Sequence, residues 1–193
     1  MRLLLLYSHP VESSFGAALH VLTRESLERG GHTVDDCDLY AEGFDPVLSR
    51  QERLTYHDHP ENIAPVKAYV ERLQKAEGLV IVTPVWNFGF PAILKGYFDR
   101  VWLPGVSFDL VDGRVRSRLH HIRKLGTVMT YGATPLRAFL AGNPPKKMVT
   151  RVLRAQIKPW SPVSFLAHYD MNNGTADTRA AFMAKVQAKM EKF

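Results

Sequence analysis

The hydrophobic residues of the chain form two kinds of pattern that alternate along it. Continuous runs of apolar and β-branched residues predict strands that are buried on both faces of a parallel sheet. Strands are predicted at residues 2–8, 32–39, 78–84, 125–130 and 163–168, of which 2–8 and 78–84 are the clearest apolar runs. Between them, apolar residues recur three and four positions apart, which is the spacing of one face of an α-helix. The pattern therefore predicts strands that alternate with helices.

The helices are predicted from their apolar faces and from the residues at their ends. Ser13 or Ser14 is suited to cap the first helix, and Gly30 and Gly31 are suited to end it. Residues 134–157 are expected to be helical in part, with a break at 142–145. The predicted buried faces are Phe15, Ala18, Leu19 and Leu22; Ile63, Val66, Val70 and Leu73; Ile93, Leu94, Tyr97, Phe98 and Val101; and Phe182, Val186, Met190 and Phe193.

This alternation predicts a doubly wound α/β domain, in which a five-stranded parallel sheet carries helices on both faces. We expect residues 1–193 to form one such domain, with strand order 2-1-3-4-5. Ligands of these sheets bind beyond the carboxyl ends of the strands, where the strand order reverses. Here that point lies between the first and third strands, so the loops of interest are HPVESSFG at 9–16 and PVWNFGFP at 84–91.

Two connections stand out from the regular pattern. Residues 40–62 are polar and too long for an ordinary connection, and the sequence assigns them no conformation. Asp112-Gly113 lies between two short alternating runs, which predicts a β-hairpin ahead of the fourth strand.

Charge and composition narrow the class of protein. The formal net charge is +6, and much of the excess lies at 114–124, a stretch without aromatic residues that we expect to be a solvated basic loop. We expect no nucleic-acid partner. The single cysteine, Cys37, is expected to be an ordinary buried residue, and a cytoplasmic location is the default expectation for such a chain. The run Leu3–Leu6 is too short for a membrane span, and the histidines show no metal-binding spacing.

The first loop has the chemistry of an anion site. His9, Ser13 and Ser14 precede the predicted first helix, whose unpaired N–H groups carry partial positive charge. The loop matches neither the dinucleotide GxGxxG pattern nor the GxxxxGK[ST] phosphate loop, so a phosphate or pyrophosphate would be held by side chains as well as backbone. Simple N-capping explains either serine alone equally well.

The second loop has the chemistry of a site for a flat ring. Trp86 and Phe88 flank Asn87 and Gly89 beyond the end of a strand, where a surface loop has no need of large aromatic side chains. Aromatic walls with amide and backbone donors suit a planar heteroaromatic ring. A phosphate at one loop and a flat ring at the next describe a flavin.

These loops resemble those of the flavodoxin-like NAD(P)H:quinone oxidoreductases of the DT-diaphorase type, over nearly the whole chain. The pair Asn87-Phe88 is similar to the version found in FMN-dependent azoreductases. The segment Thr130-Tyr131-Gly132 resembles the family's third flavin loop, and TADTR, ending at Arg179, resembles a segment that approaches the adenylate of the cofactor. By this resemblance the expected flavin-binding residues are His9, Ser14, Phe15, Gly16, Pro84, Val85, Trp86, Asn87, Phe88, Gly89, Thr130, Gly132 and Arg179.

The resemblance implies an enzyme in which NAD(P)H reduces a flavin and the flavin passes two electrons to a quinone-like acceptor, in a ping-pong cycle. It favours FAD, with FMN as the alternative. A homodimer is expected on separate grounds, because a monomer would expose apolar residues such as Trp102, Val106 and Phe108. One departure concerns the Tyr and His that the quinone reductases carry after the third loop, since the matching stretch here, ATPLRAFLAGN, contains neither. Tyr131 or Arg137 could substitute, or the substrate proton could come from water; Tyr131 is the expected catalytic residue. Phe108 and Tyr131 are the expected substrate contacts.

Two other classes of function remain open from the sequence. One is a flavodoxin-like electron carrier, and the other is a regulatory module that binds flavin without turnover. A nucleic-acid role would rest on net charge alone.

Overall fold

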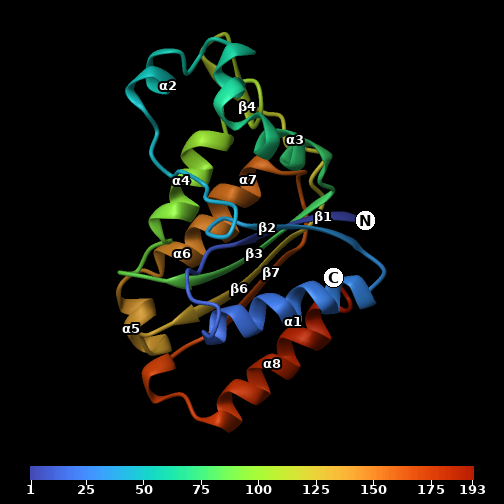
Figure 1. Ribbon diagram of the computed structural model, residues 1–193, viewed down its shortest axis with the longest axis vertical. Coiled ribbons are helices and arrows are strands. Elements are labelled where there is room, and N and C mark those ends of the chain that lie inside the picture. Colours follow the sequence, from blue (N-terminus) through green and yellow to red (C-terminus); the bar gives the residue numbers. More distant parts are fainter.

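The computed structural model describes residues 1–193 as a three-layer α/β fold (Figure 1). Its central sheet has five parallel strands in the order β2-β1-β3-β6-β7, and β4 and β5 form a separate antiparallel hairpin. Counted without the hairpin, this is the predicted order 2-1-3-4-5, which is therefore confirmed. The strands are β1 (Arg2–Tyr7), β2 (Thr33–Asp38), β3 (Gly78–Val85), β4 (Phe108–Val111), β5 (Arg114–Ser117), β6 (Leu125–Tyr131) and β7 (Val163–His168).

Helices cover both faces of the sheet. Figure 1 shows α1 and α8 side by side on one face, with α3, α4, α6 and α7 on the other. The α-helices are α1 (Phe15–Arg29), α2 (Arg50–Leu54), α3 (Lys67–Lys75), α4 (Ala92–Val101), α5 (Pro135–Leu140), α6 (Pro144–Lys147), α7 (Arg154–Gln156) and α8 (Ala176–Met190). Two 3₁₀-helices, η1 (Glu61–Val66) and η3 (Met171–Asn173), and a π-helix, η2 (Met148–Leu153), complete the structure.

Alternate residues of the strands enter two separate cores. In β1, Leu4 and Leu6 pack with α3 and α4, whereas Leu3 and Leu5 pack with α1 and α8. All four leucines are fully buried, and each such burial contributes about 1.5–3 kcal/mol. The continuous apolar run at the start of the chain is thus explained by a strand that is covered on both faces.

The first helix begins and ends where predicted, but its buried face differs. Ser14 caps α1 and Gly30 follows its last turn. Leu19 is buried as predicted, and Phe15 and Leu22 are half-buried against the same core, whereas Ala18 is exposed and His20, Thr23, Ser26 and Leu27 are buried as well. Apolar spacing missed this face because polar residues share it, and the Ser26 hydroxyl satisfies itself by donating to the Leu22 carbonyl oxygen at 2.6 Å.

The long polar stretch 40–62 contains a short helix that an ion pair holds against α4. Ser49 and Glu52 form a capping box at the start of α2. Buried Arg100 of α4 pairs with Glu52 at 2.6 Å and also donates to the Asp45 carbonyl oxygen. The chain passes so close to α4 that a Cβ atom at Gly96 would lie 2.3 Å from the Pro46 carbonyl oxygen, so only glycine fits there.

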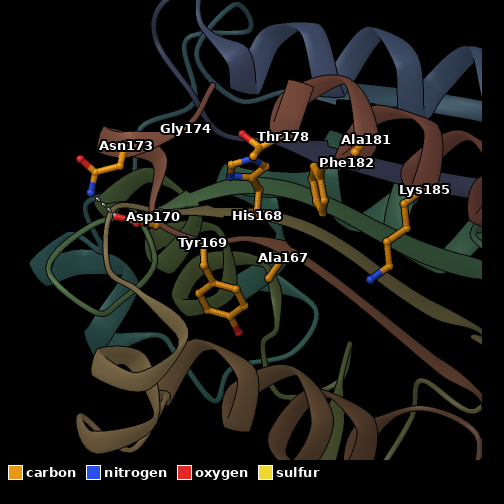
Figure 2. A pocket seen from close by; sticks show the side chains of 10 residues that line it. All are labelled: Ala167, His168, Tyr169, Asp170, Asn173, Gly174, Thr178, Ala181, Phe182 and Lys185. Atoms are coloured by element: carbon orange, nitrogen blue, oxygen red, sulfur yellow. Dashed lines mark hydrogen bonds between the residues drawn. The ribbon is translucent and has the colours of Figure 1, made fainter. Parts of the chain in front are cut away.

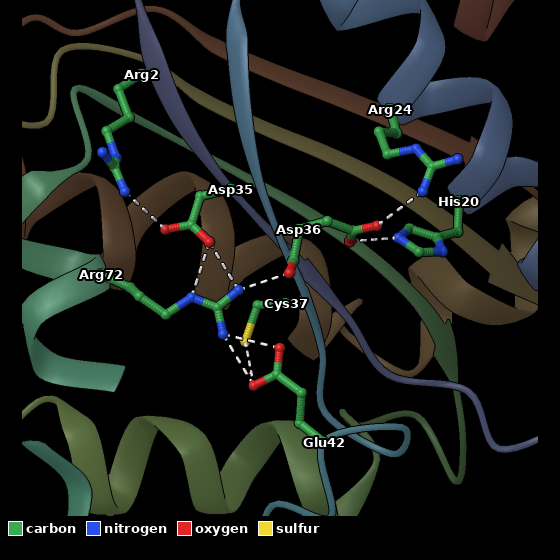
Figure 3. A network of polar contacts seen from close by, with 8 residues as sticks. All are labelled: Arg2, His20, Arg24, Asp35, Asp36, Cys37, Glu42 and Arg72. Carbon is green, nitrogen blue, oxygen red and sulfur yellow. Dashed lines mark hydrogen bonds and ion pairs between the residues drawn. The ribbon is translucent and has the colours of Figure 1, made fainter. Parts of the chain in front are cut away.

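A second polar network fixes β2 to its neighbours (Figure 3). Arg72 of α3 donates to Asp35 at 2.9 Å, to both Glu42 oxygens at 2.8 Å and to the Asp36 carbonyl oxygen at 2.6 Å. Cys37 lies beside this network and is buried and free, and burial raises the pKa of its thiol. The prediction that Cys37 is an ordinary buried residue fits this position.

Several other sequence predictions are confirmed and some are wrong. The predicted hairpin is β4–β5, with Asp112 and Gly113 at its turn, and its strand β5 starts the stretch 114–124, which is therefore not simply a solvated loop. The second predicted helix is two pieces, η1 and α3, because Pro65 has no N–H group to donate.

Trp102 and Val106, expected to be exposed, are buried in the core of the chain itself. No helix has both the length and the apolar character needed to cross a bilayer.

Candidate functional site

The first and second loops meet at the carboxyl ends of the adjacent strands β1 and β3. The imidazole of His9 packs edge-on against the indole of Trp86, with ring centroids 5.8 Å apart and an interplanar angle of 62°. Beneath them the buried Ser8 hydroxyl donates to the Thr83 hydroxyl oxygen at 2.7 Å. The two loops predicted to act together are thus linked by direct contacts.

The first loop presents backbone donors at the start of α1. The Ser14 hydroxyl oxygen accepts the Ala17 N–H at 3.1 Å, and the His9 Nδ1 accepts the Val11 N–H at 3.1 Å. This hydrogen bond leaves Nε2 as the protonated nitrogen of a neutral His9. The N–H groups of Phe15 and Gly16 have no partner in the chain. A helix N-terminus with two free donors, a hydroxyl and an imidazole fits a phosphate group.

The second loop is a tight two-residue turn with unusual backbone geometry. Trp86 and Gly89 exchange N–H···O bonds of 3.1 and 2.8 Å, and between them Asn87 and Phe88 have φ of 49° and 56°. A left-handed phenylalanine is strained, and such strain concentrates at binding and catalytic sites. The turn leaves the N–H groups of Asn87 and Phe88 free. The N–H groups of Trp86 and Gly89 are hydrogen-bonded within the turn and are not available to a ligand.

Two side chains of this turn are open to solvent. Trp86 is 42% exposed and Phe88 is 38% exposed. Pro84 and Val85, also predicted to belong to the site, are the last two residues of β3. Pro84 is buried and Val85 is half-buried. The loop therefore offers an aromatic surface with two amide donors beside it, which fits the edge of a planar heteroaromatic ring.

The third loop follows β6, the strand next to β3. The N–H groups of Gly132 and Ala133 have no partner in the chain, so this loop also offers free donors, and Thr130 is half-buried at the end of the strand. Tyr131 is only 1% exposed. Its hydroxyl donates to the Asn143 Oδ1 at 3.0 Å, and its ring packs on Tyr169 at 4.6 Å.

The burial of Tyr131 changes its expected role. Burial raises the pKa of its hydroxyl. This burial favours a positioning role for Tyr131, and the direct catalytic and substrate contact expected from the sequence stays a prediction. The sequence missed the burial because a strand-end tyrosine has the same pattern whether its ring points into the core or out of it.

Phe108, the other predicted substrate contact, lies far from these loops. It begins β4, which Figure 1 places near the C-terminal end of α4, whereas the Trp86–Gly89 turn precedes the N-terminal end of the same helix. Within one chain Phe108 therefore does not adjoin the site. The sequence placed it there because it is close along the chain to the aromatic loop.

The end of the chain also reaches the first loop. The Arg179 guanidinium of α8 lies 5.9 Å from the centre of the Phe15 ring. Beside it, a cavity of ≈ 360 Å³ opens between β7 and α8 (Figure 2). His168, which no sequence signal singled out, lines this cavity, is buried against Phe15 and Phe182, and has no partner for its Nδ1.

The family model that matches this chain is described as a flavodoxin-like fold and covers residues 1–192. The chain belongs to this family. A NAD(P)H:quinone oxidoreductase of Methanothermobacter marburgensis has the same fold with a TM-score of 0.84 and 25% identity, over 99% of this chain and 98% of that one. An FMN-dependent NADH-azoreductase of Bacillus anthracis, at 14% identity, shares the flavodoxin-like fold with a TM-score of 0.78 over 99% and 98% of the two chains.

Another relative is similar over about half of its length. The NAD(P)H dehydrogenase [quinone] 1 of Cavia porcellus is 34% identical over 123 residues, which are 55% of this chain and 45% of that protein. The chain spans about half the length of the curated relatives that it matches. The match to the flavodoxin-like family, in contrast, spans nearly the whole chain.

Proposed function

We propose that this protein is a flavin-dependent NAD(P)H oxidoreductase that passes two electrons to a quinone-like acceptor, with residues 1–193 as one flavin-binding domain. Similarity to proteins named as NAD(P)H:quinone oxidoreductases supports the reaction class. A single free cysteine supports our placing it in a reducing compartment, the cytoplasm.

The observation on which the proposal rests is the contact between His9 and Trp86. It joins an anion site to an aromatic surface, and a flavin has both a phosphate and a planar ring. We assign the phosphate to His9, Ser14, Phe15 and Gly16. The ring is assigned to Trp86, Asn87 and Phe88 on one side and to the third loop on the other.

When bound, the flavin supplies two-electron transfer between a nicotinamide and an acceptor. The chain's own part is to hold the ring and to place donors at its polar edge. The free N–H groups of Asn87, Phe88, Gly132 and Ala133 are suited to stabilise negative charge there. Beside the ring, Trp86 and Phe88 would line a slot that takes a nicotinamide or a quinone, one after the other.

FAD is the form of flavin that we favour. Arg179 lies against Phe15 at the proposed phosphate site, where a second phosphate and an adenosine would follow the first. The cavity between β7 and α8 adds space and polar side chains, among them Asn173, Thr178 and Lys185 (Figure 2). FMN would leave these groups without a ligand.

A homodimer is part of the proposal, but on different grounds from those in the sequence. Leu136, Phe139 and Leu140 of α5 are 66%, 74% and 73% exposed, and they follow directly after the third loop. An apolar group of this kind next to a binding site is typical of a protein interface. Phe108 would then contribute to the site of the second copy, because it cannot reach the site of its own chain.

The test of the proposed reaction combines two assays on the purified protein. The flavin is released by heat and identified by mass, and NADH and NADPH oxidation is followed with a soluble naphthoquinone. Turnover that depends on both flavin and quinone supports the proposal. Bound flavin without turnover would point instead to a carrier or a regulatory module.

A further inference from the structure

A groove of ≈ 610 Å³ begins at the aromatic turn and has no role in the flavin site described above. One end is formed by Gly89 and Phe90, the residues that follow Trp86, Asn87 and Phe88. The rest is formed by the segment after the third loop, from Ala141 to Val152, and by Lys95 of α4. The groove therefore starts where a nicotinamide would stack and leads away from that place.

The groove is lined by apolar and by cationic side chains. Phe90, Pro145, Met148 and Val152 supply apolar surface, while Lys147 and Arg151 supply charge. Neither cation pairs with an acidic side chain, and no acidic residue lines the groove. Lys95, the third cation of the groove, is already paired with Asp99. An anionic ligand would therefore meet two uncompensated positive charges.

The backbone of this segment is built for a site. Met148–Leu153 is a π-helix, a rare conformation that is found often at functional sites. It places Met148, Arg151 and Val152 along the groove. Gly142 has φ of 78°, which favours glycine, and the Lys147 ammonium lies beside it, 3.4 Å from where a Cβ atom would be. Asn143 ties the start of the segment to the third loop through its bond to Tyr131.

We propose that this groove binds the adenosine end of the nicotinamide dinucleotide and that Lys147 and Arg151 bind its 2′-phosphate, so that the enzyme prefers NADPH to NADH. This inference rests on the proposed oxidoreductase function, whose reaction needs either NADPH or NADH as the electron donor. The 2′-phosphate carries nearly two negative charges, and Arg151 is suited to a bidentate contact with it. NADH lacks the group that would compensate the two cations.

The test compares the double variant Lys147→Glu/Arg151→Glu with the wild type and with Arg114→Glu/Arg116→Glu. The last variant makes the same change in charge on the exposed hairpin, outside the groove. For wild type we expect kcat/KM to be about tenfold or more higher for NADPH than for NADH, as for a charge-assisted phosphate contact. The groove variant loses this preference because its kcat/KM falls much more for NADPH than for NADH, and the hairpin variant keeps the preference.

A binding assay gives a readout that does not depend on turnover. Calorimetry measures the affinity of the purified protein for adenosine 2′,5′-bisphosphate and for adenosine 5′-phosphate. We expect wild type and the hairpin variant to bind the bisphosphate about tenfold more tightly than the monophosphate. The groove variant should bind the two ligands with equal affinity. Arg151→Lys, which keeps the charge but loses the bidentate geometry, should give an intermediate ratio.

Three results would overturn the inference while leaving the proposed reaction intact. They are equal use of NADH and NADPH by the wild type, an equal effect of the groove and hairpin variants, and a groove variant that loses only activity toward an anionic naphthoquinone. The last result would assign the groove to the acceptor. A protein that binds no flavin and oxidises neither nucleotide would instead overturn the proposed function, whatever the bisphosphate affinity.

Discussion

The His9 imidazole and the Trp86 indole lie 5.8 Å apart in an edge-on contact, although 77 positions separate them in the chain. The contact exists because β1 and β3 are neighbours in a parallel sheet and their carboxyl ends meet. It brings the anion site of the first loop beside the aromatic surface of the second. The predictions below test what each part of this arrangement contributes.

Ser14 has two roles that substitutions can separate. Aspartate is as good an N-cap as serine, so Ser14→Asp should retain the stability of the protein, whereas Ser14→Ala should lower the free energy of unfolding by about 0.5–2 kcal/mol. Flavin affinity should show the opposite order, because the carboxylate repels the phosphate while alanine removes one hydrogen bond worth about 1.5–3 kcal/mol. Urea unfolding and flavin titration measure the two effects. Equal flavin affinity in the two variants would restrict Ser14 to capping.

The backbone strain at Phe88 should lower the stability of the protein, and its ring should contribute to turnover. Its left-handed backbone costs about 1–3 kcal/mol, and glycine adopts the same φ without strain. Phe88→Gly should therefore unfold at higher urea concentration than Phe88→Ala, which keeps the strain, and both should lose turnover because the aromatic surface is gone. If Phe88→Gly kept full quinone reduction, the ring would have no part in the site.

Tyr131 should contribute to stability rather than to chemistry. Tyr131→Phe removes the hydrogen bond to Asn143 from a buried place, and the expected loss in the free energy of unfolding is about 0.5–1.5 kcal/mol. Turnover with NAD(P)H and quinone should remain within about twofold of wild type, as for a group that does not touch the reacting atoms. A much larger fall in kcat with full flavin content would restore the catalytic role expected from the sequence.

The exposed residues of α5 should form the dimer interface. Phe139→Glu places a charge in that surface, and sedimentation should show a monomer where wild type is a dimer. Trp160→Glu is the matched control, because Trp160 is 93% exposed and lies elsewhere on the chain, after α7. A wild-type protein that is monomeric at micromolar concentration, or a control that dissociates as well, would contradict this assignment.

The sequence predicted the sheet, its strand order and the two principal loops because these depend on local pattern. Continuous runs such as Leu3–Leu6 require a strand covered on both faces, and chain order in such sheets then places 9–16 beside 84–91. The serine cap and the Asp112-Gly113 turn are equally local, since each satisfies its own backbone groups.

What the sequence could not give depends on contacts between distant segments. Tyr131 is buried against Asn143 and Tyr169, and Trp102 is buried against Phe98 in the core. Aromatic residues have no pattern that distinguishes such burial from exposure at a site. The donors of Trp86 and Gly89 are consumed by a turn whose left-handed residues are not glycines. The groove with Lys147 and Arg151 exists only because 141–152 folds back beside the aromatic loop. A Gly142-Asn143 pair that interrupts a helical stretch was the one local sign of it.

The most direct test of the central claim is steady-state kinetics of the purified yellow protein with NADPH and a quinone. We predict about one flavin per chain and parallel double-reciprocal plots, because one aromatic-lined slot beside the flavin takes the nicotinamide and the acceptor in turn. A colourless protein that FAD and FMN fail to reconstitute, or plots that intersect because both substrates bind together, would contradict the account.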